Sequence, residues 1–404
     1  MFQNDLITAD FVIIGAGVMG LCIARELKRR YSDSRIVVLE KESHVGEHAS
    51  GRNSGVLHAG FYYTKDSLKA RFTRDGNKAL TNYCLEKSIP MNRCGKLVVA
   101  RNEKEIAGLN ELLYRGQQNS IELTLISEKE AREIEPTVKT FERALFSPTT
   151  SSVDPRIVLN HLLEDAKKEG IKVLFGVKYL GRKNNTIETD QGRCEAGYVV
   201  NTAGLYADRI AKDFGFSAEY TILPFKGLYL YGSDSEKKLR THVYPVPDLK
   251  NPFLGVHFTM TVDGKVKIGP TAIPAFWREH YNGLSRFSFS EMMSIFSKEF
   301  GLFFKAGFDF RRLAIEEIRK YSRFFLVKQA SELANYIDPK NYKTWGKPGI
   351  RAQLLNTKTR KLEMDFILEG DDRSTHVLNA VSPAFTCSMP FAEYVVDYIE
   401  KKQT

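Results

Sequence analysis

The stretch DFVIIGAGVMG, residues 10–20, decides the fold. Its first five residues form a short apolar run, which is typical of a buried parallel strand. The strand ends in a GxGxxG motif, and residues 21–30 then have the apolar spacing of a helix. Gly15 makes the tight turn, Gly17 lets backbone approach a pyrophosphate, and Gly20 lets the helix pack against the strand. The helix N-terminus supplies N–H groups for the phosphates.

A second strand is predicted at 35–39, and it ends at Glu40. A carboxylate about 20 residues beyond the glycines is placed to accept hydrogen bonds from ribose hydroxyls. A glycine motif alone is weak evidence, because many glycine-rich turns bind nothing. The order of strand, glycines, helix, strand and acid predicts a dinucleotide-binding domain.

Two later segments of small residues favour a long, extended cofactor. ASGRNSGVLHAG at 49–60 suits backbone that passes a flat ring and a second phosphate, and YVVNTAG at 198–204 is a strand that breaks at small residues. Glycine where a strand breaks is typical of close backbone approach to a ligand. These two segments favour a flavin dinucleotide over a nicotinamide one.

Length and composition set outer limits on the class of protein. The 404 residues allow two domains, and the net charge of +10 is spread along the chain without a basic block, so it favours anionic partners without selecting one. Five widely spaced cysteines indicate reduced thiols in a cytoplasmic protein. No apolar run is long enough to span a bilayer. GxSxG, HExxH and Walker A motifs are absent, which argues against the hydrolase, zinc-protease and P-loop classes.

Several segments together resemble the FAD-dependent D-amino-acid-oxidase-like superfamily and, within it, the L-2-hydroxyglutarate dehydrogenase/oxidase family. They run from the first strand to residue 388 and include NSGVLHAGFYY (53–63), GKLVVA (95–100), VNTAGLYADRIA (200–211), PFKGLYLY (224–231), PFLGVHFT (252–259) and GIRAQ (349–353). The chain departs from the family pattern at Lys226, where Arg is expected, and at Leu228, where Glu is expected. NAVSPAFTCS at 379–388 differs at three positions, so a relative with a shifted substrate remains an alternative.

The resemblance implies an α/β (α+β overall) fold: a Rossmann-like FAD-binding domain with an inserted antiparallel-sheet substrate domain. We expect the FAD domain at 1–94, 148–218 and 345–404, and the substrate domain at 95–147 and 219–344. The alternating pattern at 222–273 fits an antiparallel sheet. The residues expected to bind FAD are Gly15, Gly17, Gly20, Glu40, Lys41, Arg52, Asn53, Ser54, Gly55, Thr202, Ala203, Gly204, Ser382 and Pro383.

The resemblance also implies hydride transfer from the α-carbon of a 2-hydroxy acid, most simply L-2-hydroxyglutarate, to flavin. The departing hydroxyl proton needs a base, and His58 and His257 lie in family-like segments. Either histidine could instead be a hydrogen-bonded structural residue. Glycerol-3-phosphate or an amino acid is the rival substrate. A non-catalytic flavin-binding module, such as an RNA-modification partner, is the rival class, although we expect no nucleic acid.

The substrate is expected to meet cationic and phenolic side chains. Arg351 offers a bidentate fork to the carboxylate, its alternative being a solvated surface arginine. A second carboxylate could use Lys226, Arg52 or Lys69. Tyr63 and Tyr244 could hydrogen-bond substrate oxygens.

An apolar helical stripe at 284–337 has two interpretations. It is either core or a surface for peripheral attachment to the inner face of the cytoplasmic membrane, and the basic residues beside it are Lys298, Lys305, Arg311 and Arg312. Phe303, Phe304, Phe324 and Phe325 would then make contact. The electron acceptor is accordingly expected to be a quinone or dioxygen.

Overall fold

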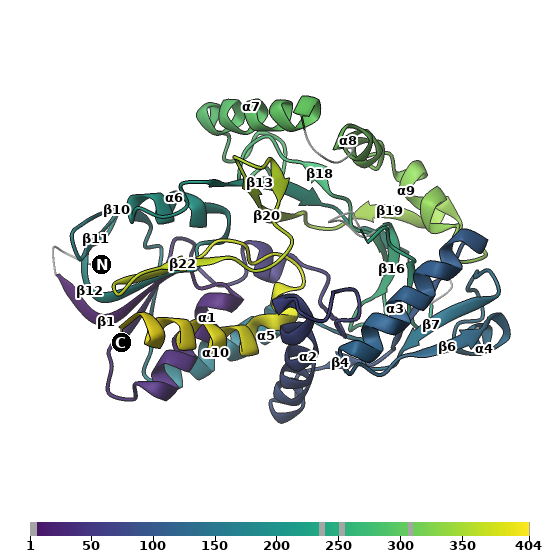
Figure 1. Cartoon of the computed structure of the whole chain (residues 1–404), viewed down its shortest axis with the longest axis horizontal. Coiled ribbons are helices and arrows are strands. Elements are labelled where there is room, and N and C mark those ends of the chain that lie inside the picture. The colour runs from purple at the N-terminus through teal and green to yellow at the C-terminus, as the bar shows by residue number, and fades with distance from the viewer. Residues whose placement is uncertain (1–5, 234–238, 250–254, 306–309, 404) are drawn as a thin grey trace. The chain divides into compact units, whose positions relative to one another are not determined.

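The computed structural model describes residues 6–233, 239–249, 255–305 and 310–403, with backbone alone at 299–305 and 310–314 (Figure 1). The chain forms two compact units, each built from separate segments. Unit 1 comprises Met1–Asn53, Pro155–Pro224 and Arg351–Thr404, and unit 2 comprises Ser54–Asp154 and Phe225–Ile350. No helix in these ranges is both long and apolar enough to cross a membrane.

Unit 1 is built on a parallel sheet. Its parallel strands have the order β23-β12-β1-β2-β9, and an antiparallel β10-β11 pair extends the sheet beside β12. The strands are β1 (Ile7–Ile14), β2 (Ile36–Glu40), β9 (Lys172–Phe175), β10 (Tyr179–Lys183), β11 (Thr186–Thr189), β12 (Gly192–Asn201), β22 (Leu368–Gly370), which pairs with β23, and β23 (Ser374–Val377). Buried aliphatic residues on β1, β2 and β12 form its core. The Rossmann-like prediction is confirmed.

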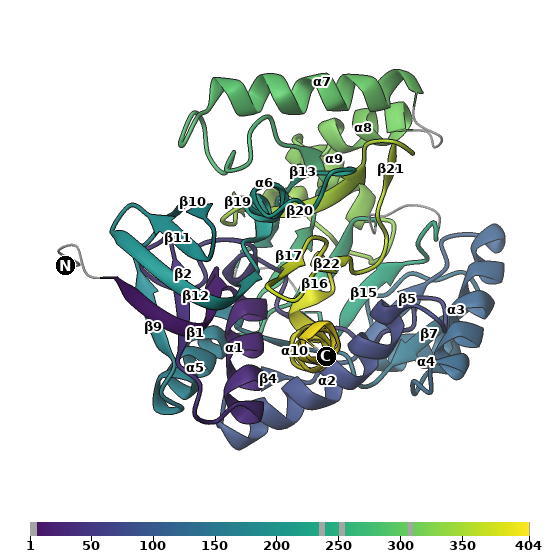
Figure 2. The ribbon, with the colours of Figure 1, turned by 60° about the vertical axis from the view of Figure 1, so that its left-hand side comes forward.

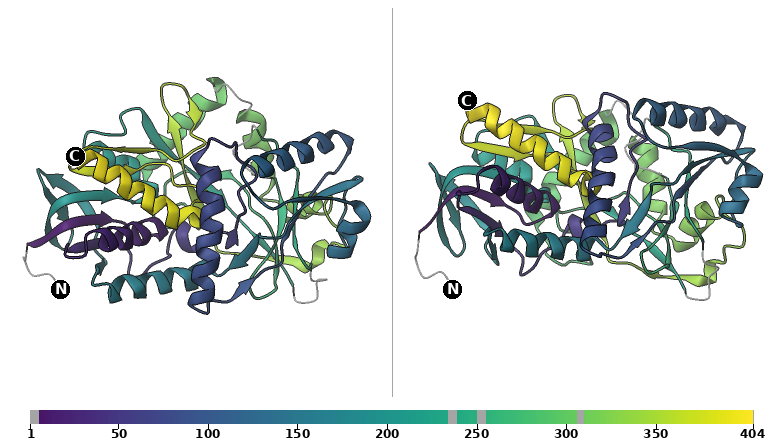
Figure 3. Two further views of the ribbon diagram at one scale, coloured as in Figure 1. Left: turned by 60° about the horizontal axis from the view of Figure 1, so that its bottom comes forward. Right: turned by 90° about the horizontal axis from the view of Figure 1, so that it is seen from below.

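Three helices pack together on unit 1. Helix α1 (Val18–Arg30) contacts both α5 (Pro155–Lys168) and α10 (Ala384–Gln403), as Figure 3 shows. Helix α5 begins at Pro155, a residue that is common at the first helical position. The shorter α6 (Ala207–Asp213) contacts β10, β12 and β23. The close α1 packing keeps the glycine turn at the end of β1 in place.

Unit 2 contains an eight-stranded sheet of order β19-β14-β17-β16-β15-β5-β7-β6. Neighbouring strands are antiparallel except for the parallel pair β15 and β5. The strands are β5 (Lys96–Val99), β6 (Thr124–Ser127), β7 (Arg143–Ser147), β14 (Leu230–Gly232), β15 (His242–Pro245), β16 (His257–Met260), β17 (Val266–Gly269) and β19 (Tyr342–Trp345). This confirms the antiparallel sheet expected for the inserted domain.

Helices and short strands complete unit 2 (Figure 2). Strand β8 (Ser151–Val153) pairs with β3 (Val56–Leu57) and β4 (Met91–Asn92). The helices are α2 (Leu68–Glu86), α3 (Ile106–Gln118), α4 (Glu128–Ile134), α7 (Phe289–Lys305), α8 (Phe310–Arg319) and α9 (Arg323–Ala330). Strand β13 (Tyr220–Gly227) begins in unit 1 and continues into unit 2 from Phe225, where it pairs with β18 (Ile273–Pro274). Strand β20 (Gly349–Asn356) begins in unit 2, continues into unit 1 from Arg351 and pairs there with β21 (Lys361–Leu362).

The division differs from the predicted boundaries mainly at residues 54–94, with shorter differences at 148–154, 219–224 and 345–350. Residues 54–94 were expected in the FAD domain, and they lie in unit 2. The reason is local pairing: β3 and β4 both join β8, so this segment shares a sheet with residues 151–153. The chain from Ser54 onward therefore belongs to unit 2, although its small and polar residues had suggested the FAD domain.

Candidate functional site

The turn after β1 requires glycine at two positions. Gly15 has φ +106°, and a Cβ there would lie 2.8 Å from the carbonyl oxygen of Thr202. A Cβ on Gly20 would lie 1.9 Å from the carbonyl oxygen of Gly15, so α1 could not stay this close to the strand end. The turn is a cradle closed by backbone, as the pyrophosphate-binding prediction requires.

Two side chains tie this cradle to neighbouring strand ends. The Glu40 carboxylate accepts hydrogen bonds from the backbone N–H groups of Ala16 (2.9 Å) and Glu42 (3.0 Å). The Thr202 hydroxyl lies 3.0 Å from the carbonyl oxygens of both Ile14 and Gly15. Glu40 is thus oriented at the end of β2 before any ligand binds.

The segment after β2 folds back toward the same helix. Ser50 accepts a hydrogen bond from the Val18 N–H at 3.0 Å, and the Asn53 side chain donates to the Ser50 carbonyl at 2.7 Å. Arg52 donates to the Glu47 carbonyl at 2.5 Å and pairs with its carboxylate at 3.3 Å. Arg52 is therefore held by Glu47, which weakens its candidacy for binding a second substrate carboxylate.

These features of unit 1 fit the phosphates and ribose of FAD. The first turn of α1 carries no acidic side chain, its N-cap is Gly17, and an ordered carboxylate lies at Glu40. An acid-free helix N-terminus favours an anion. The remaining predicted cofactor residues of unit 1 lie at strand or helix ends: Lys41, whose ammonium is 4.8 Å from the Tyr206 ring, Thr202, Ala203, Gly204, and Ser382 with Pro383 just before α10.

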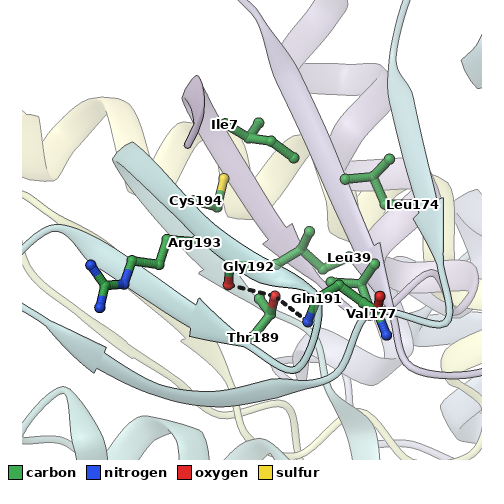
Figure 4. Close-up of a pocket in the computed structure, with 9 residues that line it drawn as sticks. All are labelled: Ile7, Leu39, Leu174, Val177, Thr189, Gln191, Gly192, Arg193 and Cys194. Atoms are coloured by element: carbon green, nitrogen blue, oxygen red, sulfur yellow. Dashed lines mark hydrogen bonds between the residues drawn. The ribbon is translucent and has the colours of Figure 1, made fainter. Parts of the chain in front are cut away.

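A small pocket elsewhere in unit 1 lies outside this cradle (Figure 4). Aliphatic side chains of Ile7, Leu39, Leu174 and Val177 line it together with Cys194. The polar Thr189 is engaged within the β11–β12 turn, where its hydroxyl donates to the Gly192 carbonyl. The pocket contains no predicted site residue, and we interpret it as a packing gap of the sheet.

Unit 2 contains a group of four nitrogen bases, which we call the basic cluster: His58, Lys96, His242 and His257. Lys96 and His242 are register partners on β5 and β15, so they lie on the same face of the sheet. Lys96 and His242 are 0% exposed and His257 is 3% exposed. His58 is partly accessible to solvent although it lies deep among packed atoms. Of the four, His58 is the one that is not fully buried by its accessible surface.

The Lys96 ammonium lies among aromatic rings instead of carboxylates. Its Nζ atom is 4.5 Å from the Phe61 ring centre, 4.6 Å from that of Tyr62 and 4.9 Å from that of Tyr244. Within the described residues Nζ has no hydrogen-bond partner. Burial lowers the pKa of Lys96 to about 7, because removal from water disfavours the charged amine.

Hydrogen bonds define the proton positions on two imidazoles. The His257 Nδ1 atom lies 2.8 Å from the Gly255 carbonyl oxygen, which can only accept, so Nδ1 carries the hydrogen. When the ring is neutral, Nε2 is then the atom that can accept a proton. His242 is the opposite case, because its Nδ1 accepts from the Met260 N–H at 3.0 Å. The His257 ring also stacks on Tyr244 at 3.7 Å, so Tyr244 belongs to the same face.

Electrostatics keep His58 neutral. Burial lowers its pKa well below the usual value, and the charges of Lys96, His257 and His242 lower it further. A neutral imidazole is the form that can accept a proton. The lowered pKa of His58 is compatible with its predicted role as a base.

The other predicted residues are spread over both units. Lys226 is 5% exposed, and burial lowers its pKa to about 8. Lys69 lies 6.0 Å from the Tyr63 ring centre, so these two candidates are neighbours. Ser54 and Gly55 precede β3 in unit 2, where Lys267 donates to the Ser54 carbonyl at 2.9 Å. Arg351 lies half-buried on β20 in unit 1.

Sequence reasoning missed Lys96, His242 and Lys267. Successive side chains of a strand point to opposite faces, which places Lys96 and His242 opposite the apolar Leu97 and Val243, and the run His242-Val243-Tyr244 shows this alternation. That alternation was the available signal. The register that joins β5 to β15 across more than a hundred residues of sequence gave no signal.

Comparisons with known proteins agree with this geometry. A family model described as FAD dependent oxidoreductase matches residues 10–398. The chain is 36% identical to the mitochondrial L-2-hydroxyglutarate dehydrogenase of Homo sapiens, with 97% of this chain and 89% of that protein covered. It is 34% identical to L-2-hydroxyglutarate dehydrogenase of Escherichia coli K12, with 97% and 93% covered.

Solved structures show the same fold at lower identity. The L-alpha-glycerophosphate oxidase of Mycoplasma pneumoniae, solved with FAD bound, superposes with a TM-score of 0.77 at 21% identity, covering 98% of this chain and 95% of that one. Glycine oxidase of Geobacillus kaustophilus superposes with a TM-score of 0.73 at 19% identity, covering 98% and 96%.

Proposed function

Because the chain belongs to the FAD dependent oxidoreductase family, we propose that it oxidises L-2-hydroxyglutarate to 2-oxoglutarate. The observation that carries the proposal is the near-complete match to relatives of that name, at 34–36% identity with 97% of this chain covered. The lowered pKa of His58, which keeps a base available for the hydroxyl proton, supports it. Bound FAD supplies the acceptor for the hydride from the substrate α-carbon.

The chain's own residues divide the remaining work. His58 takes the hydroxyl proton, which must leave as the α-carbon loses its hydride. His257, with Nε2 as acceptor, is the second candidate base. Arg351 holds the carboxylate next to the reacting carbon through a bidentate contact. Lys226, a buried amine, holds the distal carboxylate that distinguishes this substrate from a monocarboxylic hydroxy acid.

Anaerobic reduction of the FAD holoenzyme tests the substrate. L-2-hydroxyglutarate is expected to bleach the flavin absorbance, while D-2-hydroxyglutarate, glycerol-3-phosphate and L-glutamate leave it unchanged. Reduction by glycerol-3-phosphate or L-glutamate alone would assign the chain to a different substrate class. Failure of all four would support a non-catalytic flavin module.

We infer further that the cytoplasmic protein attaches peripherally to a membrane and passes electrons to a quinone. The stripe at 284–337 is partly core, since Ile295, Leu326 and Val327 are buried. Other large apolar side chains of this stripe are exposed: Phe287 just before α7, and Phe289, Met293, Phe296, Ile315, Ile318 and Phe324 on α7, α8 and α9. Phe325 is half-buried, Lys298 lies beside this apolar surface on α7, and the side chains of Phe303, Phe304, Lys305, Arg311 and Arg312 lie outside the described part.

Vesicle binding tests this attachment. The protein should sediment with anionic phospholipid vesicles, because an apolar helix face inserts into the interface. The double variant Phe289→Ser with Phe296→Ser should lose most of this binding and keep its flavin reduction rate. Unchanged sedimentation would reject the surface, and turnover with dioxygen alone would reject the quinone.

A further inference from the structure

A chain of hydrogen bonds crosses the interior of unit 1 beside the glycine cradle. It links Asn201 at the end of β12 to His376 and Ser374 on β23, and then to Asp371 between β22 and β23. Asn201 and His376 are register partners on the two parallel strands, and the side chains of Asn201, His376 and Ser374 are buried. A buried polar network that is fully hydrogen-bonded imposes one specific geometry on its surroundings.

Hydrogen bonds to backbone define the orientation of the Asn201 amide. Its Nδ2 atom donates to the Ala207 carbonyl oxygen at 2.8 Å, and that oxygen can only accept. Its Oδ1 atom accepts from the Ala203 N–H at 3.2 Å, and that group can only donate. The amide nitrogen is therefore also the atom that faces His376, at 3.1 Å from Nδ1.

This orientation of the amide determines where His376 carries its hydrogen. Because Nδ2 of Asn201 donates, Nδ1 of His376 must accept, and the ring hydrogen lies on Nε2. Nε2 then donates to the Ser374 hydroxyl at 3.2 Å, and this hydroxyl donates to the Asp371 carboxylate at 3.2 Å. Burial lowers the pKa of His376 to about 4, so the ring is neutral near neutral pH. Donors and acceptors are thus matched from the carboxylate to the Ala203 N–H.

The Asn201 end of the chain lies against the glycine cradle. A Cβ on Gly15 would lie 2.8 Å from the Thr202 carbonyl oxygen, and one on Gly20 would lie 2.8 Å from the Thr202 hydroxyl oxygen. The backbone that follows Asn201 is therefore one wall of the cradle. A rotation of the Asn201 side chain would break its hydrogen bond to the Ala203 N–H, and this wall would lose a support.

We propose that His376 is a positioning residue for the cofactor: by accepting a hydrogen bond from Asn201, it fixes the amide that holds the backbone of Thr202–Gly204 in the form that binds FAD. Without this acceptor, one Asn201 N–H would be buried and unpaired, which favours rotation of the side chain. The proposal rests on the predicted contact of Thr202–Gly204 with FAD and does not depend on which acid the enzyme oxidises.

The first test compares the dissociation constant of FAD in two variants of His376. His376→Phe keeps an aromatic ring against Phe214 and Phe216, whose ring centres lie 5.0 and 5.1 Å from the imidazole, and removes the acceptor. FAD should then bind about tenfold more weakly, because binding must first order the wall of the cradle. His376→Asn offers an amide oxygen near the position of Nδ1 and should restore the affinity of the parent.

Val377→Ala is the matched control, a loss of buried volume at the next residue of β23. It should lower thermal stability through lost packing and leave FAD affinity unchanged. The fluorescence of flavin released on dilution of the holoenzyme measures the affinity. Equal affinity in the parent and His376→Phe would overturn the proposal. So would a loss in His376→Asn or Val377→Ala as large as the loss in His376→Phe.

Nitrogen NMR of the isotope-labelled parent holoenzyme tests the tautomer without any variant. The imidazole of His376, assigned through bonds from its own backbone, should carry its hydrogen on Nε2 at neutral pH. A hydrogen on Nδ1 would overturn the proposal even if no variant folds. A flavin that L-2-hydroxyglutarate cannot reduce would instead overturn the proposed substrate, while the affinity and the tautomer still test the role of His376.

Discussion

The glycine cradle of unit 1 and the basic cluster of unit 2 are built in opposite ways. The cradle is formed by backbone: Gly15 and Gly20 have no Cβ that would block its close approach, and two backbone N–H groups hold the Glu40 carboxylate. In the basic cluster, side chains from separate strands meet, and a buried ammonium has rings for neighbours. The comparison teaches that the cradle is defined by close backbone approach, whereas the basic cluster is defined by side chains that strand pairing brings together.

The largest effect should come from the basic cluster. Replacing His58 with Asn removes the base, and flavin reduction should slow by roughly 10²–10⁴-fold, the usual contribution of general-base catalysis. FAD content should stay unchanged, because the cradle formed by Gly15, Gly20 and Glu40 is unaltered. Anaerobic stopped-flow absorbance measures the rate. His161→Gln, a matched change on α5, should reduce normally, and a normal rate in His58→Asn would move the base to His257.

The cradle should respond through binding instead. In Gly20→Ala the added Cβ would meet the Gly15 carbonyl oxygen at 1.9 Å, so α1 must shift away from the strand end. Overpacking of this kind costs about 1–3 kcal/mol, and FAD affinity should fall by about 10-fold to 100-fold. The ratio of flavin to protein absorbance after dialysis measures it. Gly181→Ala, where a Cβ meets nothing within 4 Å, is the control; equal FAD retention by both variants would contradict the cradle.

A milder change in the cradle should have a smaller effect. Glu40→Gln keeps one acceptor and loses the charge that binds the Ala16 and Glu42 N–H groups. Hydrogen bonds to charged groups contribute about 1.5–3 kcal/mol, and Gln should recover part of this, so FAD should bind about tenfold more weakly. Fluorescence titration of the apoprotein with FAD checks the value. An unaltered affinity would mean that Glu40 supports only the turn.

The last comparison concerns stability and pH. The unfolded chain holds the Lys96 proton up to about pH 10.4, whereas burial lowers the pKa in the folded state to about 7. Between these values the unfolded state binds more protons, so the Lys96 contribution makes the free energy of unfolding rise with pH, by at most about 1.4 kcal/mol per pH unit. Lys96→Met should show a flatter pH profile in denaturant unfolding. If the parent and Lys96→Met gave parallel pH profiles of the free energy of unfolding, burial would not lower the pKa of Lys96.

The two regions also differed in how far sequence could predict them. Gly15, Gly20 and Glu40 lie within 26 residues of chain, and each has a local steric or charge requirement that its spacing reveals. Lys96 and His242 meet only because β5 pairs in parallel with β15. The register between distant strands depends on how whole sheets pack, and this packing cannot be read from a single sequence. The unit boundary after Asn53 was missed for the same reason, since it depends on the pairing of β3 and β4 with β8.

The most direct test of the central claim is a single anaerobic turnover with L-2-hydroxyglutarate deuterated at C2. We predict that one 2-oxoglutarate forms per FAD reduced, and that deuterium slows the reduction because the C2–H bond breaks in that step. Flavin that stays oxidised in the presence of this substrate, or that is reduced without formation of 2-oxoglutarate, would contradict the account.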